Sequence, residues 1–176
     1  MTQMFHVKLK AEDTMYETAE ERQHLQEMME RSRSAATDHL QEIVTPDHSL
    51  SAEALLPRLE GMKVLSLATV TRRGEPRVSA VDGHFIHGAW TFGTDGRSAK
   101  ARHLAHRPSV SAAYIDGERL GFFTHGIVEP LDASDAQYDG IIQHWTAHYG
   151  SSPLSWGEEI RMYRIRPRWC VAYAGE

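Results

Sequence analysis

A hydroxyl and three cations occur together in the segment Arg97-Ser98-Ala99-Lys100-Ala101-Arg102, which is expected to open a short helix. The first N–H groups of a helix have no partner within it, and the helix dipole favours negative charge at that end. These N–H groups, the Ser98 hydroxyl and the Lys100 ammonium could together hold a phosphate. The alternative is a solvated basic face. The segment therefore indicates a site for one end of a phosphorylated ligand, with that alternative still open.

The elements around this helix are mainly β-strands. Lys63–Val70 is a nearly continuous apolar run with β-branched residues, and a glycine-containing hairpin turn follows it. Six strands, mostly joined by hairpins and with one helix after the third, predict a small closed or half-closed antiparallel barrel. The other five expected strands are Pro76–Ile86, Ala89–Thr94, Val110–Ile115, Arg119–Glu129, and a last strand from Arg161–Ile165 to Trp169–Tyr173, broken or bulged at Pro167.

The first fifty residues differ from the rest, so we expect an N-terminal helical extension (residues 1–50) before a barrel domain (residues 51–176). Phe5, Val7 and Leu9 alternate with polar residues like a short strand. Thr14–Ile43 is typical of one or two helices with a narrow apolar stripe. Such a stripe predicts docking on the chain's own barrel or on a dimer partner, and a separate binding module is the alternative.

Composition limits the classes of function. The chain has 176 residues, 41% of them hydrophobic, and a net charge of −5, which fits one principal domain without a nucleic-acid partner. No apolar run approaches the roughly 18 residues of a membrane span, and no leader precedes the first strand, so a cytoplasmic protein without a membrane partner is expected. The single cysteine, Cys170, is expected to be a buried, inert thiol.

A histidine pair raises the question of a metal. His144 and His148 lie four residues apart on an expected helix over Asp135–Tyr149, and this spacing puts both on one face. The segment lacks the glutamate of a zincin motif, and the sequence does not position a third ligand. No metal site is therefore predicted.

Other histidines and a tryptophan are weaker candidates for a site. His103 and His106 are expected to face solvent. His84 and His125 are expected to be satisfied barrel histidines, with approach to a cofactor as the alternative. Trp169 is expected in the core or an interface, from which it could reach a cofactor of a neighbouring subunit.

Three segments resemble a known family: LATVTRRGEPRVSAVDG, WTFGTDGRSAKARHLAHRPSVSAAY and YRIRPRWCVAY. They are similar to the flavin-binding split β-barrels related to pyridoxamine 5′-phosphate oxidase. The resemblance covers about residues 52–176, and its most specific part is the spacing of Ser98, Lys100, Leu104 and Pro108. It implies a six-stranded antiparallel split β-barrel with short helices, and a homodimer with two flavin sites at the subunit interface.

The resemblance also implies which residues bind the cofactor. The second strand would run under the isoalloxazine edge, the third would approach the ring and ribityl chain through its backbone, and the helix would hold the phosphate. The implied residues are Ser79, Ala80, Val81 and Asp82 on the second strand, Phe92, Gly93 and Thr94 on the third, and Ser98 and Lys100 at the helix, with Arg97 or Arg102 as a compensating cation and Trp169 from the partner subunit. No catalytic residue is predicted.

The sequence departs from the oxidase itself at three places, and at one of them, the C-terminal segment, the oxidase's substrate-phosphate residues have no clear counterpart beyond Arg164-Ile165-Arg166-Pro167. The oxidase carries Ser-Arg-Lys at the phosphate helix, whereas this chain has Ser98-Ala99-Lys100. The oxidase's second strand is cationic at both ends, and its counterpart here is Ser79-Ala80-Val81-Asp82-Gly83-His84. Oxidation of pyridoxamine phosphate is therefore not expected.

Three functions remain open. The first is an FMN-dependent oxidoreductase that takes electrons from a donor and reduces a small acceptor. The second is a reductase that uses the deazaflavin F-420, whose longer anionic tail needs a basic groove. The third is a non-catalytic flavin- or haem-binding protein. The sequence favours FMN, because capture of a single phosphate is visible whereas a groove would depend on four scattered arginines, Arg72, Arg73, Arg77 and Arg102.

Overall fold

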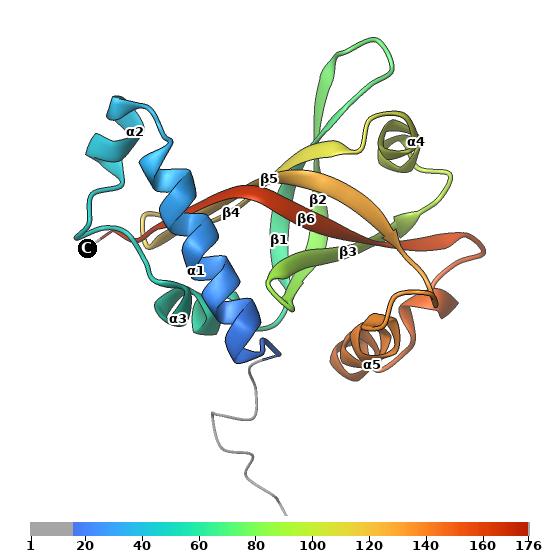
Figure 1. Cartoon of the computed structure of the whole chain (residues 1–176). Coiled ribbons are helices and arrows are strands. Elements are labelled where there is room, and N and C mark those ends of the chain that lie inside the picture. The colour runs from blue at the N-terminus through green and yellow to red at the C-terminus, as the bar shows by residue number, and fades with distance from the viewer. Residues whose placement is uncertain (1–15, 176) are drawn as a thin grey trace, which may run out of the picture.

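The computed structural model describes residues 16–175, whose six strands form one closed antiparallel barrel (Figure 1). The order around the barrel is first, second, third, sixth, fifth and fourth strand. This arrangement confirms the predicted mainly β fold of six antiparallel strands. The strands are β1 (Lys63–Val70), β2 (Pro76–Ile86), β3 (Ala89–Asp95), β4 (Ser109–Asp116), β5 (Leu120–Leu131) and β6 (Ile160–Tyr173).

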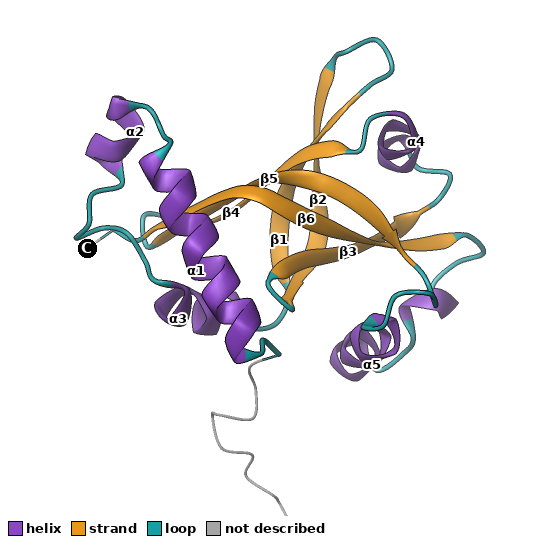
Figure 2. Ribbon diagram, viewed as in Figure 1, coloured by secondary structure: helices purple, strands orange, loops and turns teal. Residues whose placement is uncertain are grey.

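Helices lie around the outside of the barrel (Figure 2). In the view of Figure 1 the longest helix crosses the left half of the barrel, and two others flank its right end. No helix among residues 16–175 is long and apolar enough to cross a bilayer. The helices are α1 (Ala19–Ser34), α2 (Asp38–Ile43), α3 (Ala52–Leu55), α4 (Ala99–His106) and α5 (Tyr138–Tyr149), with short 3-10 helices η2 (Leu56–Leu59) and η3 (Pro153–Ser155).

Strand alternation sorts the side chains of β2 into two apolar clusters. Val81 and Phe85 point into the barrel and join the main core, which includes Trp90 and Phe92. Ile86 lies on the other face, where it packs with residues of α5 and β6 in a second, smaller core. The outer face of β2 is therefore covered at one end by α5.

The last strand contains a bulge, as predicted near Pro167. On β5, His125 pairs with Trp169 and the next residue, Gly126, pairs with Pro167, so Arg168 is an extra residue on β6. A side chain at Gly126 would collide with the carbonyl group of Arg166. The bulge therefore requires a glycine opposite it.

Helix α1 docks on the barrel through its apolar stripe. Leu25 and Met29 are buried, and the Ser32 hydroxyl accepts the Cys170 N–H at 3.0 Å. Burial raises the pKa of the Cys170 thiol to about 12, which agrees with the predicted inert thiol. The strand expected at Phe5, Val7 and Leu9 lies outside the described residues. The division into an extension and a barrel domain stays a prediction.

Helix α5 begins later than predicted, at Tyr138 instead of Asp135. The Asp135 carboxylate accepts the Gln137 N–H at 2.8 Å and pairs with the Arg164 guanidinium at 2.6 Å. This side chain therefore holds a turn that precedes the helix. On the helix, the Trp145 indole N–H donates to the Thr91 hydroxyl at 3.1 Å and fixes α5 against β3.

Candidate functional site

Strands β2 and β3 pair over only part of their length. Their ladder runs from Gly83 opposite Phe92 to Ile86 opposite Ala89. Beyond it, residues 79–82 of β2 pair with β1 alone, and residues 93–95 of β3 pair with β6 alone. Within the described chain the two strands thus diverge and leave a gap between two edges with unpaired backbone groups. We call this opening, bounded by residues 79–82 and 93–95, the β2–β3 gap.

Helix α4 begins directly after the β3 edge of this gap. Ser98 is its N-cap, and the Ser98 hydroxyl oxygen accepts the Ala101 N–H at 3.2 Å. The Thr94 hydroxyl lies 3.2 Å from that of Ser98. In the part of the chain that the structure describes, the N–H groups of Ala99 and Lys100 have no hydrogen-bond partner. The first turn therefore offers two open N–H donors and two adjacent hydroxyls.

Lys100 differs from the neighbouring arginines in how its charge is used. Lys100 is partly buried, and its ammonium forms no hydrogen bond or ion pair with any residue from 16 to 175. Arg97 instead makes a two-pronged contact with Asp95 at 2.8 and 3.1 Å, and hydrogen bonds from Arg97 hold the pKa of Asp95 at about 2. Arg102 donates to the Arg97 carbonyl at 3.0 Å. Lys100 is therefore the uncommitted cation of the turn.

The β2 and β3 residues implied by the resemblance fall into two groups. Val81 and Phe92 point into the barrel, and Phe92 is 0% exposed and stacks on Tyr163 at 5.3 Å between ring centroids. These two residues can meet a ligand through backbone atoms only. Ala80 and Asp82 are exposed on the outer face of β2. Asp82 thus contributes the one carboxylate on this stretch of β2.

Small side chains border the gap. Ser79 and Thr94 are partly buried at its two edges, and Ala80 is exposed between them on the β2 side. A Cβ atom at Gly93 would lie 2.9 Å from the Met162 sulfur, which is too close for an ordinary contact. Glycine at position 93 therefore lets Met162 pack against β3.

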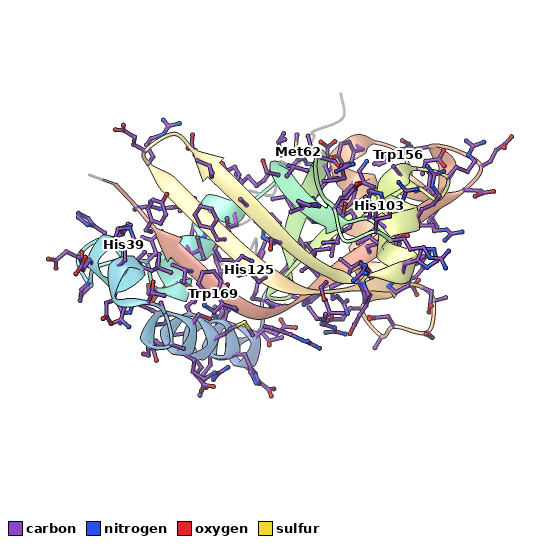
Figure 3. All side chains as sticks on the ribbon, turned by 90° about the horizontal axis from the view of Figure 1, so that it is seen from above. His39, Met62, His103, His125, Trp156 and Trp169 are labelled. Carbon is purple, nitrogen blue, oxygen red and sulfur yellow. The ribbon has the colours of Figure 1, made fainter. Side chains whose placement is uncertain are left out.

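Trp169 lies on a different part of the surface. Its ring stacks on His125 with 4.6 Å between centroids and a 19° interplanar angle, and Figure 3 shows this pair well away from His103 of α4. The His125 Nδ1 atom is 2.8 Å from the Ser111 hydroxyl, and burial lowers the pKa of His125. An open groove of about 500 Å³ includes His125 and Arg168 in its walls. One chain therefore does not bring Trp169 to the β2–β3 gap.

The prediction that His103 faces solvent is wrong. It is partly buried, and its Nδ1 atom lies 3.0 Å from the hydroxyl of Thr69, which is fully buried. The Thr69 hydroxyl needs a partner inside the protein, and His103 supplies it. His106 faces solvent, as predicted.

His84 of β2 lies against His144 and His148 of α5, and the sequence did not predict this histidine cluster. His84 is 1% exposed, its Nδ1 atom is 2.8 Å from the His144 Nε2 atom, and its ring centroid is 4.8 Å from that of His148. Burial lowers the pKa of His84 to about 3, with further contributions from His144 and His148. Among residues 16–175, no three histidine, cysteine or acidic side chains are arranged to hold a metal ion.

Tyr149 connects this cluster to the β2–β3 gap. The Tyr149 hydroxyl lies 3.4 Å from the His84 Nε2 atom and donates to the Asp82 carboxylate at 3.4 Å. Burial, followed by the nearby Asp82 charge, raises the pKa of Tyr149 to about 12. The sequence predicts only half of this contact. Strand alternation puts Asp82 and His84 on one face of β2, but it does not predict that α5 covers that face.

Comparison with known proteins gives the family. A family model described as pyridoxamine 5′-phosphate oxidase matches residues 51–170, which is more than half of the chain. No curated protein sequence matches the chain.

Solved structures share the fold at low sequence identity. The conserved hypothetical protein Rv2991 from Mycobacterium tuberculosis has a TM-score of 0.62 and 20% identity, and the match covers 74% of this chain and 88% of that one. HutZ, described as a haem storage protein from Vibrio cholerae, has a TM-score of 0.54, 20% identity, and coverage of 63% and 86%. A structure described as F420 reductase has a TM-score of 0.50, 23% identity, and coverage of 64% and 91%. The family match and the barrel agree, and the chain belongs to the pyridoxamine 5′-phosphate oxidase family.

Proposed function

We propose that this protein binds FMN in the β2–β3 gap and acts as a flavin-dependent oxidoreductase on a small acceptor. The observation that carries the proposal is the first turn of α4, where open N–H groups and the uncommitted Lys100 ammonium lie directly beside an unpaired strand edge. Membership of the pyridoxamine 5′-phosphate oxidase family supports a flavin at this position.

The residues present fit the chemical parts of FMN. The N–H groups of Ala99 and Lys100, the Ser98 hydroxyl and the Lys100 ammonium would hold the phosphate dianion. The unpaired edges of the gap would meet the ring system through backbone groups. Bound FMN would supply hydride transfer, and the chain would orient it and limit access of water.

We also propose a homodimer, because large apolar side chains are exposed on one outer face of β4, β1 and β2. Val64, Val78 and Ile115 share this face by strand register, and Val78 is 70% exposed. A second copy would cover them in an isologous interface, which for an obligate dimer buries more than about 2,000 Å². Light scattering should report a dimer, and a stable monomer that holds flavin would refute the proposal.

FMN is favoured over the deazaflavin F-420 because two of the four arginines that would form a basic groove already have partners in the chain. Arg77 pairs with Glu75 at 2.8 Å, and Arg102 donates to a backbone carbonyl group. An FMN phosphate needs fewer cations than a tail that also carries carboxylates. The acceptor would be a small conjugated or aromatic compound, with electrons from a reduced nicotinamide or a partner protein.

Titration of both cofactors at low and moderate salt tests this choice. We expect quenching of FMN fluorescence with an affinity that changes modestly with salt, because one phosphate is bound. Micromolar deazaflavin binding without measurable FMN binding would contradict the proposal. The absorption spectrum of the purified protein, with any released cofactor identified by mass, separates both flavins from haem.

A further inference from the structure

We propose that His144, His84 and Tyr149 form a proton path to Asp82, and that Asp82 is the proton-exchanging group at the β2–β3 gap. The four side chains come from two elements, β2 and α5, and link a buried histidine to an exposed carboxylate. The inference rests on the proposed function in one respect: the reaction that uses the proton is the one assigned to the gap.

The contacts along the path fit a single direction of donation. An ionised carboxylate only accepts, so the Tyr149 O–H points to Asp82. The Tyr149 oxygen then accepts the Nε2–H of His84, which leaves the His84 Nδ1 atom as an acceptor. That atom faces the His144 Nε2 atom at 2.8 Å, so His144 must donate. Every donor therefore points toward Asp82.

A neutral His84 is essential to this pattern, and its surroundings keep it neutral. It is 1% exposed, and the titratable groups that face it are His144, His148 and Tyr149 from α5, and Glu17 and Glu60 across a small cavity. None of the three α5 groups carries a negative charge at neutral pH, and burial is the largest cause of the low pKa of His84. A buried, uncharged imidazole with one donor and one acceptor can pass a proton by exchanging tautomers.

A small cavity lies at the other end of the path. A cavity of about 20 Å³, enough for one water molecule, is lined by Tyr16, Glu17, Glu60, His84 and His144. Burial raises the pKa of Glu17, so this carboxylate binds a proton more readily than an exposed glutamate. The cavity therefore puts a titratable group at the start of the path.

The transfer balances without any electron moving along the path. His144 takes one proton from solvent and passes its Nε2 proton to the His84 Nδ1 atom. His84 passes its Nε2 proton to the Tyr149 oxygen, and Tyr149 passes its own to the Asp82 carboxylate. Each intermediate group gains and loses one proton. Reduction of an organic acceptor consumes a hydride and a proton, and Asp82 would supply the proton while the reduced flavin supplies the hydride.

Nitrogen NMR of the histidine rings tests the path in the purified chain without added cofactor. We expect His84 to show the Nε2–H tautomer and to remain neutral from pH 8 to pH 5. Tyr149→Phe should shift the His84 Nε2 resonance. Tyr138→Phe, on the same helix and without a hydrogen bond from its hydroxyl within the described chain, should not. A His84 ring that carries its proton on Nδ1, or titrates near its usual value, would overturn the path.

A second measurement tests what the path does. Protein loaded with FMN and reduced with dithionite is mixed with a quinone, which needs two electrons and two protons. Tyr149→Phe should bind FMN as the parent does but reoxidise about 10- to 100-fold more slowly. Tyr138→Phe should match the parent. Equal rates for Tyr149→Phe and the parent would overturn the inference. A parent that binds no FMN would overturn the proposed function and, with it, the role of Asp82 in that reaction. A confirmed His84 tautomer would then show that the hydrogen-bonded chain itself is correct.

Discussion

The first turn of α4 and the histidine cluster under α5 lie on two sides of the same gap, yet they are built in opposite ways. The α4 turn consists of consecutive residues, its arginines are exposed, and its one uncommitted charge belongs to Lys100. The histidine cluster joins residues far apart in the sequence around the buried His84, which burial keeps neutral at physiological pH. The comparison shows that a site for an anion can rely on local structure, whereas buried titratable groups depend on the packing of a whole helix.

That packing has a clear anchor. Arg164 on β6 is 2% exposed and bonds to both Asp135 and Gln137, which directly precede α5. Burial opposes ionisation of Asp135, but the bonds from Arg164 and from the Gln137 backbone outweigh it and hold the pKa of Asp135 below its usual value. Loss of this anchor should therefore affect the α5 side and leave the α4 side intact.

The largest expected effect is that of Arg164→Met. Removal of the buried Arg164 guanidinium leaves the Asp135 carboxylate with the more distant, exposed Arg166 at 3.9 Å, so the free energy of unfolding should fall by about 3–5 kcal/mol in urea denaturation. Arg119→Met, in the exposed pair with Asp116, should change stability little. If Arg164→Met is no more destabilising than Arg119→Met, α5 is held by something other than this anchor.

Acid should also act on the α5 side. His84 stays neutral in the folded protein down to about pH 3, but it binds a proton near pH 6.5 when unfolded. Between these two pH values the unfolded chain binds more protons than the folded protein. The contribution of His84 to the free energy of unfolding is therefore fully present above about pH 6.5 and is lost as the pH falls toward 3. The loss at pH 5 should be about 2 kcal/mol.

Denaturation at pH 7 and pH 5 checks this expectation. His84→Gln should reduce the difference between the two values, whereas His106→Gln, at an exposed position, should leave it unchanged. An equal acid response in the parent and in His84→Gln would show that His84 is not the source of the sensitivity.

The smallest expected effect is on the α4 side. Arg97 is held by Asp95, so Arg97→Ala should weaken FMN binding much less than loss of the uncommitted Lys100. Fluorescence titration of the two alanine variants under the same conditions compares them. A larger loss for Arg97→Ala would mean that ligand binding breaks the Arg97–Asp95 pair.

The sequence was sufficient for what depends on neighbouring residues. The six strands, the helix that follows the third strand and the bulge near Pro167 follow from alternation and turn residues, and the structure confirms them. Family membership was likewise predictable, because the most specific part of its motif, Ser98 to Pro108, lies in one segment around α4. The cofactor roles of the predicted residues stay predictions.

The missed features all depend on contacts between distant elements. His103 was expected in solvent because nothing near it in the sequence indicates the buried Thr69 hydroxyl. The His84 cluster was missed for the same reason: helical spacing paired His144 with His148, but only the packing of α5 on β2 adds His84. Tertiary packing, and not local pattern, determines these environments.

Binding of FMN at the first turn of α4 can be tested by titration of FMN into the parent, Lys100→Ala and Lys63→Ala. Lys63 lies 5.5 Å from the centroid of the Tyr114 ring on the barrel and serves as the matched control. We expect the parent and Lys63→Ala to quench FMN fluorescence. Lys100→Ala should bind more weakly by about 1.5–3 kcal/mol, or roughly 10- to 100-fold in Kd, the range for charge-assisted hydrogen bonds. Unchanged FMN affinity in Lys100→Ala at moderate salt would show that Lys100 does not bind the FMN phosphate.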